Sequence, residues 1–151
     1  MKINIYTVEK KSVDEFSKII TNQKKMIQKY AQISEIPCFN KKISSAQNRD
    51  AIMAKESYTE VFTPYLKGCN IALHPAGKEV DSFEFSENFD TNTPLNFFIA
   101  GAYGFEEDFL KKADKVISFS KLTFSHKIAK VILFEQIYRA LTIVNKHPYH
   151  K

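Results

Sequence analysis

The chain has 151 residues, of which 44% are hydrophobic and 26% charged, so it is long enough to bury a core and has the composition of a globular protein. Its two cysteines, Cys38 and Cys69, are too few and too scattered for a disulfide framework or a thiolate zinc site, and we expect reduced thiols and no metal ion. No uncharged apolar run is long enough to cross a bilayer and the first residues form no signal peptide, which predicts a cytoplasmic protein with no membrane partner.

The net charge of +5 is unevenly distributed along the chain. Residues 68–110 carry one basic and eight acidic side chains, whereas residues 111–151 carry nine basic and two acidic ones. A basic C-terminal segment suits a polyanionic partner such as a nucleic acid. Since 20 of the 22 basic residues are lysines, a generally lysine-rich composition explains the charge equally well, and charge alone does not decide.

The chain begins with a strand pattern followed by a helix pattern. Residues Lys2–Val8 alternate apolar and polar side chains, which predicts a strand. Ser12 is expected to cap the helix, and Glu15 to complete a capping box. An apolar stripe carries this helix to about Gln32.

Two strands around a long helix are predicted next. Ser34–Phe39 forms the first strand, and Pro37, which cannot donate to a strand ladder, indicates the edge of a sheet. A single helix is expected from about Ser45 to Leu66. Cys69–Leu73 is a compact apolar run typical of a buried strand, and it breaks at His74-Pro75-Ala76-Gly77.

The second half of the chain continues the alternation. The acidic segment 79–90 is the least regular part, and one short helix is expected there with Phe83, Phe85 and Phe89 packing inward. The later elements are a strand at 94–100, a helix at 106–113, a strand at 115–119 and a closing helix at 126–145. This order predicts one α/β domain spanning residues 1–151, with a mainly parallel sheet and helices on both faces.

Ligands of such sheets bind in loops beyond the carboxyl ends of the strands. Three loops qualify, namely Leu73–Gly77, Gly101–Gly104 and Ser118–Ser125. Gly101 and Gly104 follow a buried strand, where glycine lets a ligand approach the backbone, although a plain tight turn is the alternative. Neither a dinucleotide fingerprint nor a P-loop is present. The hydroxyls of the third loop either surround a small ligand or cap the next helix.

The terminal stretch His147-Pro148-Tyr149-His150 is the most unusual in the chain. Its two imidazoles and phenol suit stacking on a nucleobase and hydrogen bonding to it. A frayed terminus is one alternative. A metal site completed by His126 is another, which we disfavour because no carboxylate or thiolate lies nearby in sequence.

The closing helix is apolar around most of its surface but contains Arg139 near its middle. An arginine in such a helix needs a partner, which is either a phosphate or carboxylate of a ligand or Glu135 at i–4 spacing. A helix this apolar must be buried on more than one side. Since a sheet covers only one side, we expect a homodimer interface.

Four segments resemble, in order, the motifs of a known family. They are Phe98–Phe105 (family motif I-G-G-P-E-G), Ser118–His126 (S-x-S-x-x-T-x-x-H), Glu135–Ala140 (E-Q-I/L-Y-R-A) and Asn145–Lys151 (N-x-P-Y-H-K/R). The chain resembles the SPOUT-class ribosomal RNA large-subunit methyltransferase H family, the pseudouridine N3-methyltransferases. Length and strand order agree across the whole chain, and the matching is densest after residue 95.

The resemblance implies a trefoil-knotted α/β fold, which is an exception to the rule that chains avoid knots. It also implies an obligate homodimer that binds S-adenosylmethionine in a bent form, through Leu73, Gly101 and the loop residues Ser120, Lys121, Leu122, Thr123, Phe124 and Ser125. The implied substrate is a pseudouridine of large-subunit (23S) ribosomal RNA, presented at the subunit interface by the assembled ribosome.

Methyl transfer to the imide nitrogen of pseudouridine requires loss of its proton or stabilisation of the anion. We therefore expect Arg139 to anchor the RNA and steady the tail, and His147, Tyr149 and His150 to orient the base and take its proton. These residues are expected to act on the cofactor of the partner subunit. His126 is instead expected to be a helix-cap residue.

The chain departs from the family motifs at three places. Residues Leu73–Gly77 correspond to the family motif L-D-x-x-G but lack the aspartate. Residues Ala100–Gly104 correspond to G-G-P-E-G but lack one glycine, the proline and the glutamate. Residues Thr123–His126 correspond to T-x-P-H but lack the proline. Such changes are tolerable where the cofactor contacts are largely made by the backbone. A noncatalytic RNA-binding or ribosome-binding dimer is the first alternative function, and a nucleotide-binding α/β protein unrelated to RNA is the second.

Overall fold

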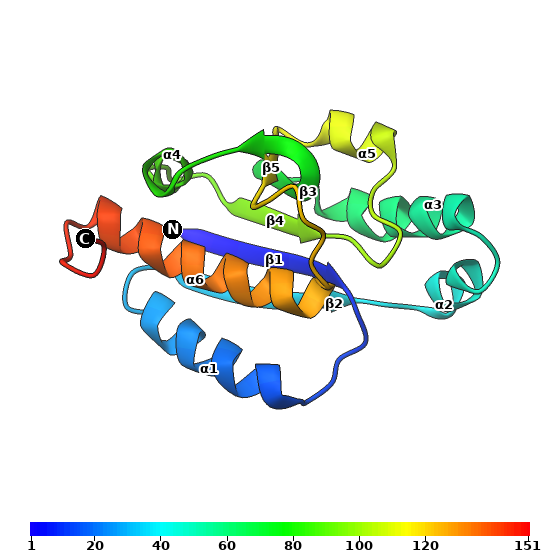
Figure 1. Ribbon diagram of the computed structural model, residues 1–151, viewed down its shortest axis with the longest axis horizontal. Coiled ribbons are helices and arrows are strands. Elements are labelled where there is room, and N and C mark those ends of the chain that lie inside the picture. The colour runs from blue at the N-terminus through cyan, green and yellow to red at the C-terminus, as the bar shows by residue number, and fades with distance from the viewer.

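The computed structural model describes residues 1–151, and its centre is one sheet of five parallel strands in the order β2-β1-β4-β3-β5 (Figure 1). The strands are β1 (Lys2–Val8), β2 (Gln32–Cys38), β3 (Cys69–Glu79), β4 (Leu95–Ile99) and β5 (Lys115–Ser118). Every neighbouring pair is parallel, which confirms the predicted sheet. β2 lies at an edge, as Pro37 indicated.

Helices cover both faces of this sheet, as expected (Figure 1). One face carries α1 (Glu15–Ile27), α4 (Ser82–Ser86) with the 3-10 turn η2 (Glu87–Phe89), and α6 (His126–Val144). The other face carries α2 (Lys41–Gln47), α3 (Ala51–Phe62) with the 3-10 turn η1 (Thr63–Tyr65), and α5 (Glu107–Lys112). None of these helices combines the length and apolar character needed to cross a membrane.

The central strand β4 shows why the sheet is buried on both sides. Its five residues are all buried, and alternate side chains enter different clusters: Phe97 packs under α6, whereas Phe98 packs under α3 and α5. Each fully buried phenylalanine contributes about 2–3 kcal/mol of hydrophobic stabilisation. The continuous apolar run that predicted a strand at 94–100 therefore reflects a two-sided core.

The first helix prediction was wrong at both ends because the chain uses another cap. Asp14, not Ser12, caps α1: its carboxylate accepts from the amides of Phe16 and Ser17, and the Ser17 hydroxyl completes the capping box. The helix ends at Ile27, short of the predicted Gln32. A carboxylate is a strong cap, and its position leaves residues 9–13 as a loop after β1.

The predicted helix from Ser45 to Leu66 is two helices separated at residues 48–50. Asn40 caps the first of them by accepting from the Ile43 amide, and Asp50 caps the second by accepting from the Met53 amide. The break occurs because Asp50 satisfies the first amides of α3 instead of continuing α2.

Beyond Leu73, β3 continues through a bulge to Glu79, where the sequence predicted a break. Leu73 and Lys78 both pair with Ile117 of β5, so residues 74–77 are additional in β3. In the acidic segment, Phe85 and Phe89 are buried as predicted, but Phe83 is 60% exposed and this prediction was wrong. An Asp81 capping box fixes α4 so that Phe83 and Phe85, two residues apart, point in different directions.

Candidate functional site

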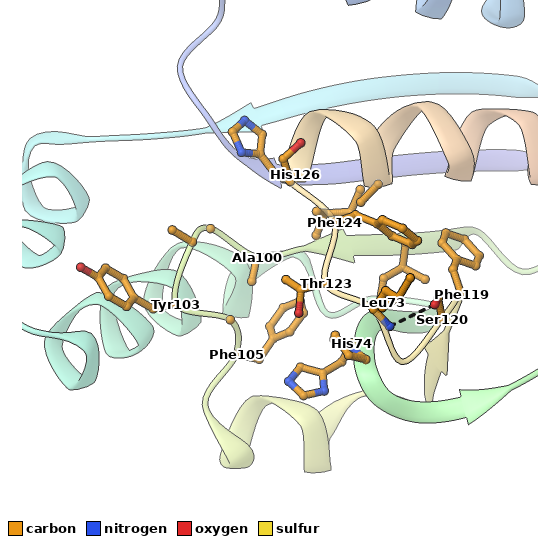
Figure 2. A pocket seen from close by; sticks show the side chains of 18 residues that line it. Leu73, His74, Ala100, Tyr103, Phe105, Phe119, Ser120, Thr123, Phe124 and His126 are labelled. Carbon is orange, nitrogen blue, oxygen red and sulfur yellow. Dashed lines mark hydrogen bonds between the residues drawn. The ribbon is translucent and has the colours of Figure 1, made fainter.

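The three loops singled out by the sequence meet at the carboxyl edge of the sheet and enclose a cavity of about 570 Å³ (Figure 2). The first of them, residues 73–77, forms the bulge within β3, the other two follow β4 and β5, and the first turns of α6 complete the wall. Of the expected cofactor-binding residues, all but one line this cavity: Leu73, Gly101, Ser120, Leu122, Thr123, Phe124 and Ser125. Lys121 lies in the same loop but does not line it.

The cavity has an apolar part and a polar part. Leu73, Ile99, Phe105, Phe119 and Phe124 supply most of the apolar surface, whereas hydroxyls and backbone groups of the third loop supply polar atoms. Such a mixture is typical of small-molecule sites, in which a few polar groups fix the orientation of a largely apolar ligand.

At the base of the second loop, Gly101 occupies a position that has no room for a side chain. A Cβ placed there would lie 2.6 Å from the ring carbon Cζ of Tyr58, a fully buried side chain of α3 whose hydroxyl donates to Gln47. Gly104, with a φ of +78°, closes the turn by donating its amide to the carbonyl of Gly101 at 3.0 Å. Because Gly101 has no side chain, the turn packs directly against the Tyr58 ring, and the space on the other side of the turn remains part of the cavity.

The third loop is ordered by its own hydroxyls. Ser118 Oγ donates to the carbonyl of Ser120 at 2.8 Å, and Ser120 Oγ accepts from the Leu122 amide at 3.0 Å. Ser125 caps α6 by accepting from the Ile128 amide, so the capping alternative holds for this residue. The amides of Lys121, Thr123 and Phe124 make no hydrogen bond within the protein, which leaves donors available to a ligand.

A buried ion-pair network that was not predicted from the sequence connects the start of α6 to the end of β1. Lys130 is 8% exposed and pairs with Glu9 and, at 2.7 Å, with Glu35, while His126 Nε2 lies 3.4 Å from Glu9. Although burial alone would raise it, hydrogen bonds from His126 and Lys130 lower the pKa of Glu9 to about 2. His126 thus contacts Glu9 while also lining the cavity, and Ser125 is the cap residue.

The terminal residues form an ordered cluster at the other end of α6. Arg139 pairs with Glu135 at 2.7 Å, as its spacing suggested, and also donates to His150 Nδ1 at 3.3 Å. Its guanidinium lies 4.9 Å from the centre of the Tyr149 ring, and the Tyr149 hydroxyl donates to Glu135 at 3.2 Å. His147 Nδ1 accepts from the Tyr149 amide at 3.3 Å, so all four expected catalytic residues lie together.

Sequence reasoning missed one residue of this cluster. The exposed Phe83 ring of α4 meets the His150 ring edge-on, with 5.0 Å between the ring centres. An exposed phenylalanine next to histidines is a suitable platform for a nucleobase. The sequence contains no signal that separates it from Phe85 and Phe89 of the same segment, which are buried.

The cavity lies at the first turns of α6, and the terminal cluster lies at the other end of the same helix, where Figure 1 shows the C-terminus. Ala129 lines the cavity and Arg139 holds the cluster, so about 15 Å of helix axis separates them at 1.5 Å per residue. His126 is the first residue of α6, whereas His147 and His150 follow the last, so these three histidines do not form one cluster within a chain.

A family model described as a predicted SPOUT methyltransferase matches residues 1–150. The chain belongs to the SPOUT methyltransferase family. Its relatives include proteins of Aliarcobacter butzleri and Campylobacter jejuni, each 49% identical, and of Sulfurovum sp., 47% identical; all three carry the name ribosomal RNA large subunit methyltransferase H. Each of these alignments covers the whole of this chain and the whole of the relative.

Solved structures show the same fold at low sequence identity. A probable methylase family protein from Haemophilus influenzae superposes with a TM-score of 0.55 at 12% identity, over 99% of this chain and 70% of the other. A putative RNA methyltransferase from Bacillus anthracis superposes with a TM-score of 0.54 at 10% identity, over 97% and 96% of the two chains. The SPOUT fold implies the C-terminal knot expected from the sequence.

Membership of the SPOUT methyltransferase family implies S-adenosylmethionine as cofactor, and the cavity fits such a molecule. The apolar part suits the adenine ring, and the free amides of Lys121, Thr123 and Phe124 suit its polar edge. The absence of a side chain at Gly101 keeps the space open. Because the free donors are backbone amides of the third loop, they do not depend on the changes at Ala102 and Tyr103 in the family motif.

Proposed function

We propose that this SPOUT methyltransferase transfers a methyl group from S-adenosylmethionine to N3 of a pseudouridine in large-subunit ribosomal RNA, acting on the assembled ribosome in the cytoplasm. The observation that carries the proposal is the full-length identity of 47–49% to proteins named ribosomal RNA large subunit methyltransferase H. The combination of a cofactor-sized cavity with an arginine, histidine and tyrosine cluster supports it. In this proposal, residues 1–151 form one catalytic domain.

The active enzyme in this proposal is a homodimer. A single copy separates the cavity from the terminal cluster, so the tail of one subunit would have to lie over the cavity of the other. The outer surface of α6 supports contact between two subunits, because the apolar side chains of Ile128 and Val144 are each more than a third exposed there. The dimer thereby supplies the geometry that one chain lacks.

When bound, S-adenosylmethionine supplies a methyl group on a positively charged sulfur, so the protein chiefly has to position the base and manage its N3 proton. In the structure, His150 Nδ1 accepts from Arg139 and His147 Nδ1 accepts from the Tyr149 amide. A neutral imidazole that accepts at Nδ1 carries its proton on Nε2. Both histidines therefore present N–H donors suited to the carbonyl oxygens of the base.

Acceptance of the N3 proton by His150 then requires Arg139 to release Nδ1. An RNA phosphate competing for the guanidinium would release it, because a charged oxygen is the stronger acceptor. Arg139 thus has two roles in the proposal: it binds the RNA backbone, and it frees the imidazole when that RNA is in place. Tyr149, stacked on the guanidinium, keeps the tail over the base.

The proposal is tested with ribosomes from cells that lack this gene. Labelled S-adenosylmethionine is supplied with the purified protein or its Arg139→Ala variant, and the digested ribosomal RNA is analysed by mass spectrometry. We expect a new methylated pseudouridine with the wild type, and at least about tenfold less with the variant, for the loss of one charged contact. Ribosome binding without methylation would instead favour the noncatalytic RNA-binding function.

A further inference from the structure

The bulge of β3 places an imidazole in the wall of the cofactor cavity. Residues 74–77 lie between two points at which β3 pairs with the same residue of β5, Ile117. Gly77 holds the bulge against β5, since a Cβ there would lie 2.7 Å from the carbonyl oxygen of Val116. His74, at the start of this fixed bulge, is half-buried and lines the cavity next to Phe105 (Figure 2).

One nitrogen of this imidazole is already used by the bulge. The Ala76 amide donates to His74 Nδ1 at 3.1 Å. Burial and the nearby Lys55 ammonium lower the pKa of His74, which favours the neutral ring. With Nδ1 accepting, the proton of the neutral ring lies on Nε2, so the remaining polar group is an N–H donor.

The Nε2 donor has no acceptor within the protein and lies beside the glycine turn. A Cβ added at Gly104 would meet only this atom, at 3.9 Å, so the turn leaves space in front of it. We propose that Nε2–H of His74 donates a hydrogen bond to an oxygen of the bound cofactor, either a ribose hydroxyl or the carboxylate, and so positions it. The identity of the ligand rests on the proposed function. The position of the Nε2–H donor follows from the bulge, which holds the other ring nitrogen by the Ala76 amide.

Two isosteric variants separate this role from a purely structural one. His74→Gln retains an N–H donor near the Nε2 position but loses the acceptor for Ala76. His74→Asn retains an acceptor near the Nδ1 position but cannot reach the cofactor. A cofactor contact therefore predicts that the Gln variant binds better than the Asn variant, and a bulge-stabilising role predicts the reverse.

The measurement is calorimetric binding of S-adenosylhomocysteine, which requires no RNA and no turnover. We expect His74→Ala and His74→Asn to bind about fivefold more weakly, the effect of one lost hydrogen bond, and His74→Gln to stay within about twofold of wild type. Val13→Ala, on an exposed loop away from the cavity, is the matched control. Thermal unfolding checks that each variant is folded.

A Gln variant as weak as the Ala variant, or an Ala variant as tight as wild type, would overturn the inference. Failure of the wild type itself to bind would count against the proposed function instead. A parallel titration with methylthioadenosine, which has the ribose but no carboxylate, distinguishes the two acceptors. If the Ala variant is weaker for both ligands, the acceptor is a ribose hydroxyl; if only for S-adenosylhomocysteine, it is the carboxylate.

Discussion

Gly101 illustrates how one residue determines the shape of the cavity at the carboxyl edge of the sheet. The sequence suggested that glycine at this position lets a ligand approach the backbone, or that it serves a plain tight turn. The structure gives a different reason, because a Cβ would enter the ring of Tyr58 at 2.6 Å. That ring is fully buried and its hydroxyl is bonded to Gln47, so the clash would be relieved by moving the loop into the cavity.

We therefore predict that Gly101→Ala loses cofactor affinity by at least about tenfold, while the free energy of unfolding falls by only about 1–3 kcal/mol, as in other overpacked sites. Calorimetry with S-adenosylhomocysteine and urea unfolding measure the two effects. The double variant Gly101→Ala/Tyr58→Val removes the obstructing ring and should recover most of the affinity. If it recovers none, the space argument is wrong.

The first turns of α6 depend on charges rather than on apolar packing alone. Lys130 lies between Glu9 of the loop after β1 and Glu35 of β2, and hydrogen bonds from His126 and Lys130 outweigh burial in lowering the pKa of Glu9 from 4.5 to about 2. A carboxyl group whose pKa is lower in the folded than in the unfolded protein contributes its full stabilisation at pH values above the unfolded-state pKa. This stabilisation is lost as the pH falls through the folded value.

We predict that the free energy of unfolding decreases as the pH falls from about 4.5 to about 2, and that Glu9→Gln removes about 2–3 kcal/mol of this dependence. Urea unfolding at a series of pH values measures it for both proteins. Glu60→Gln, which removes an exposed ion pair with Lys42, is the control and should change the profile little. An unchanged slope in Glu9→Gln would show that other carboxyl groups carry the acid sensitivity.

The elements differ in how far the sequence could predict them. The inner strands at 69–73 and 94–100 were found because a parallel sheet covered on both faces needs continuous apolar runs, and the first strand was found from its alternating pattern. The division between α2 and α3 was missed, because the sequence of a polar stretch does not show whether Asp50 lies inside one helix or caps the start of a second one. The partners of Lys130 were also out of reach, because Glu9 is 121 residues away and meets it only in the folded chain.

The candidate site was predictable to a similar degree. The three loops could be predicted because the carboxyl ends of parallel strands share one edge of the sheet. The terminal cluster could be predicted from its motif and from the i, i+4 spacing of Glu135 and Arg139. The exposure of Phe83 and the direction of His74 could not, since each depends on the orientation of a short helix or a bulge.

At the scale of the whole molecule, the position of α6 raises a question that no single residue answers. The helix has the cavity at its first turns and the Arg139 cluster near its last turn. A site formed within one chain would require the tail to cover about 15 Å along the helix, against the contacts that now hold it to Glu135 and Tyr138. A site shared between two subunits requires no such movement.

Mixed dimers distinguish these two arrangements. Gly101→Ala impairs the cavity and Arg139→Ala impairs the tail, so either variant alone should retain about a tenth of wild-type methylation or less at a subsaturating concentration of S-adenosylmethionine. If the site is shared, a mixed dimer combines the intact cavity of one subunit with the intact tail of the other. An equimolar mixture refolded together should then regain about a quarter of wild-type methylation, because half of the dimers are mixed and each has one complete site. If each chain forms its own site, every site in the mixture has a defect and no activity returns.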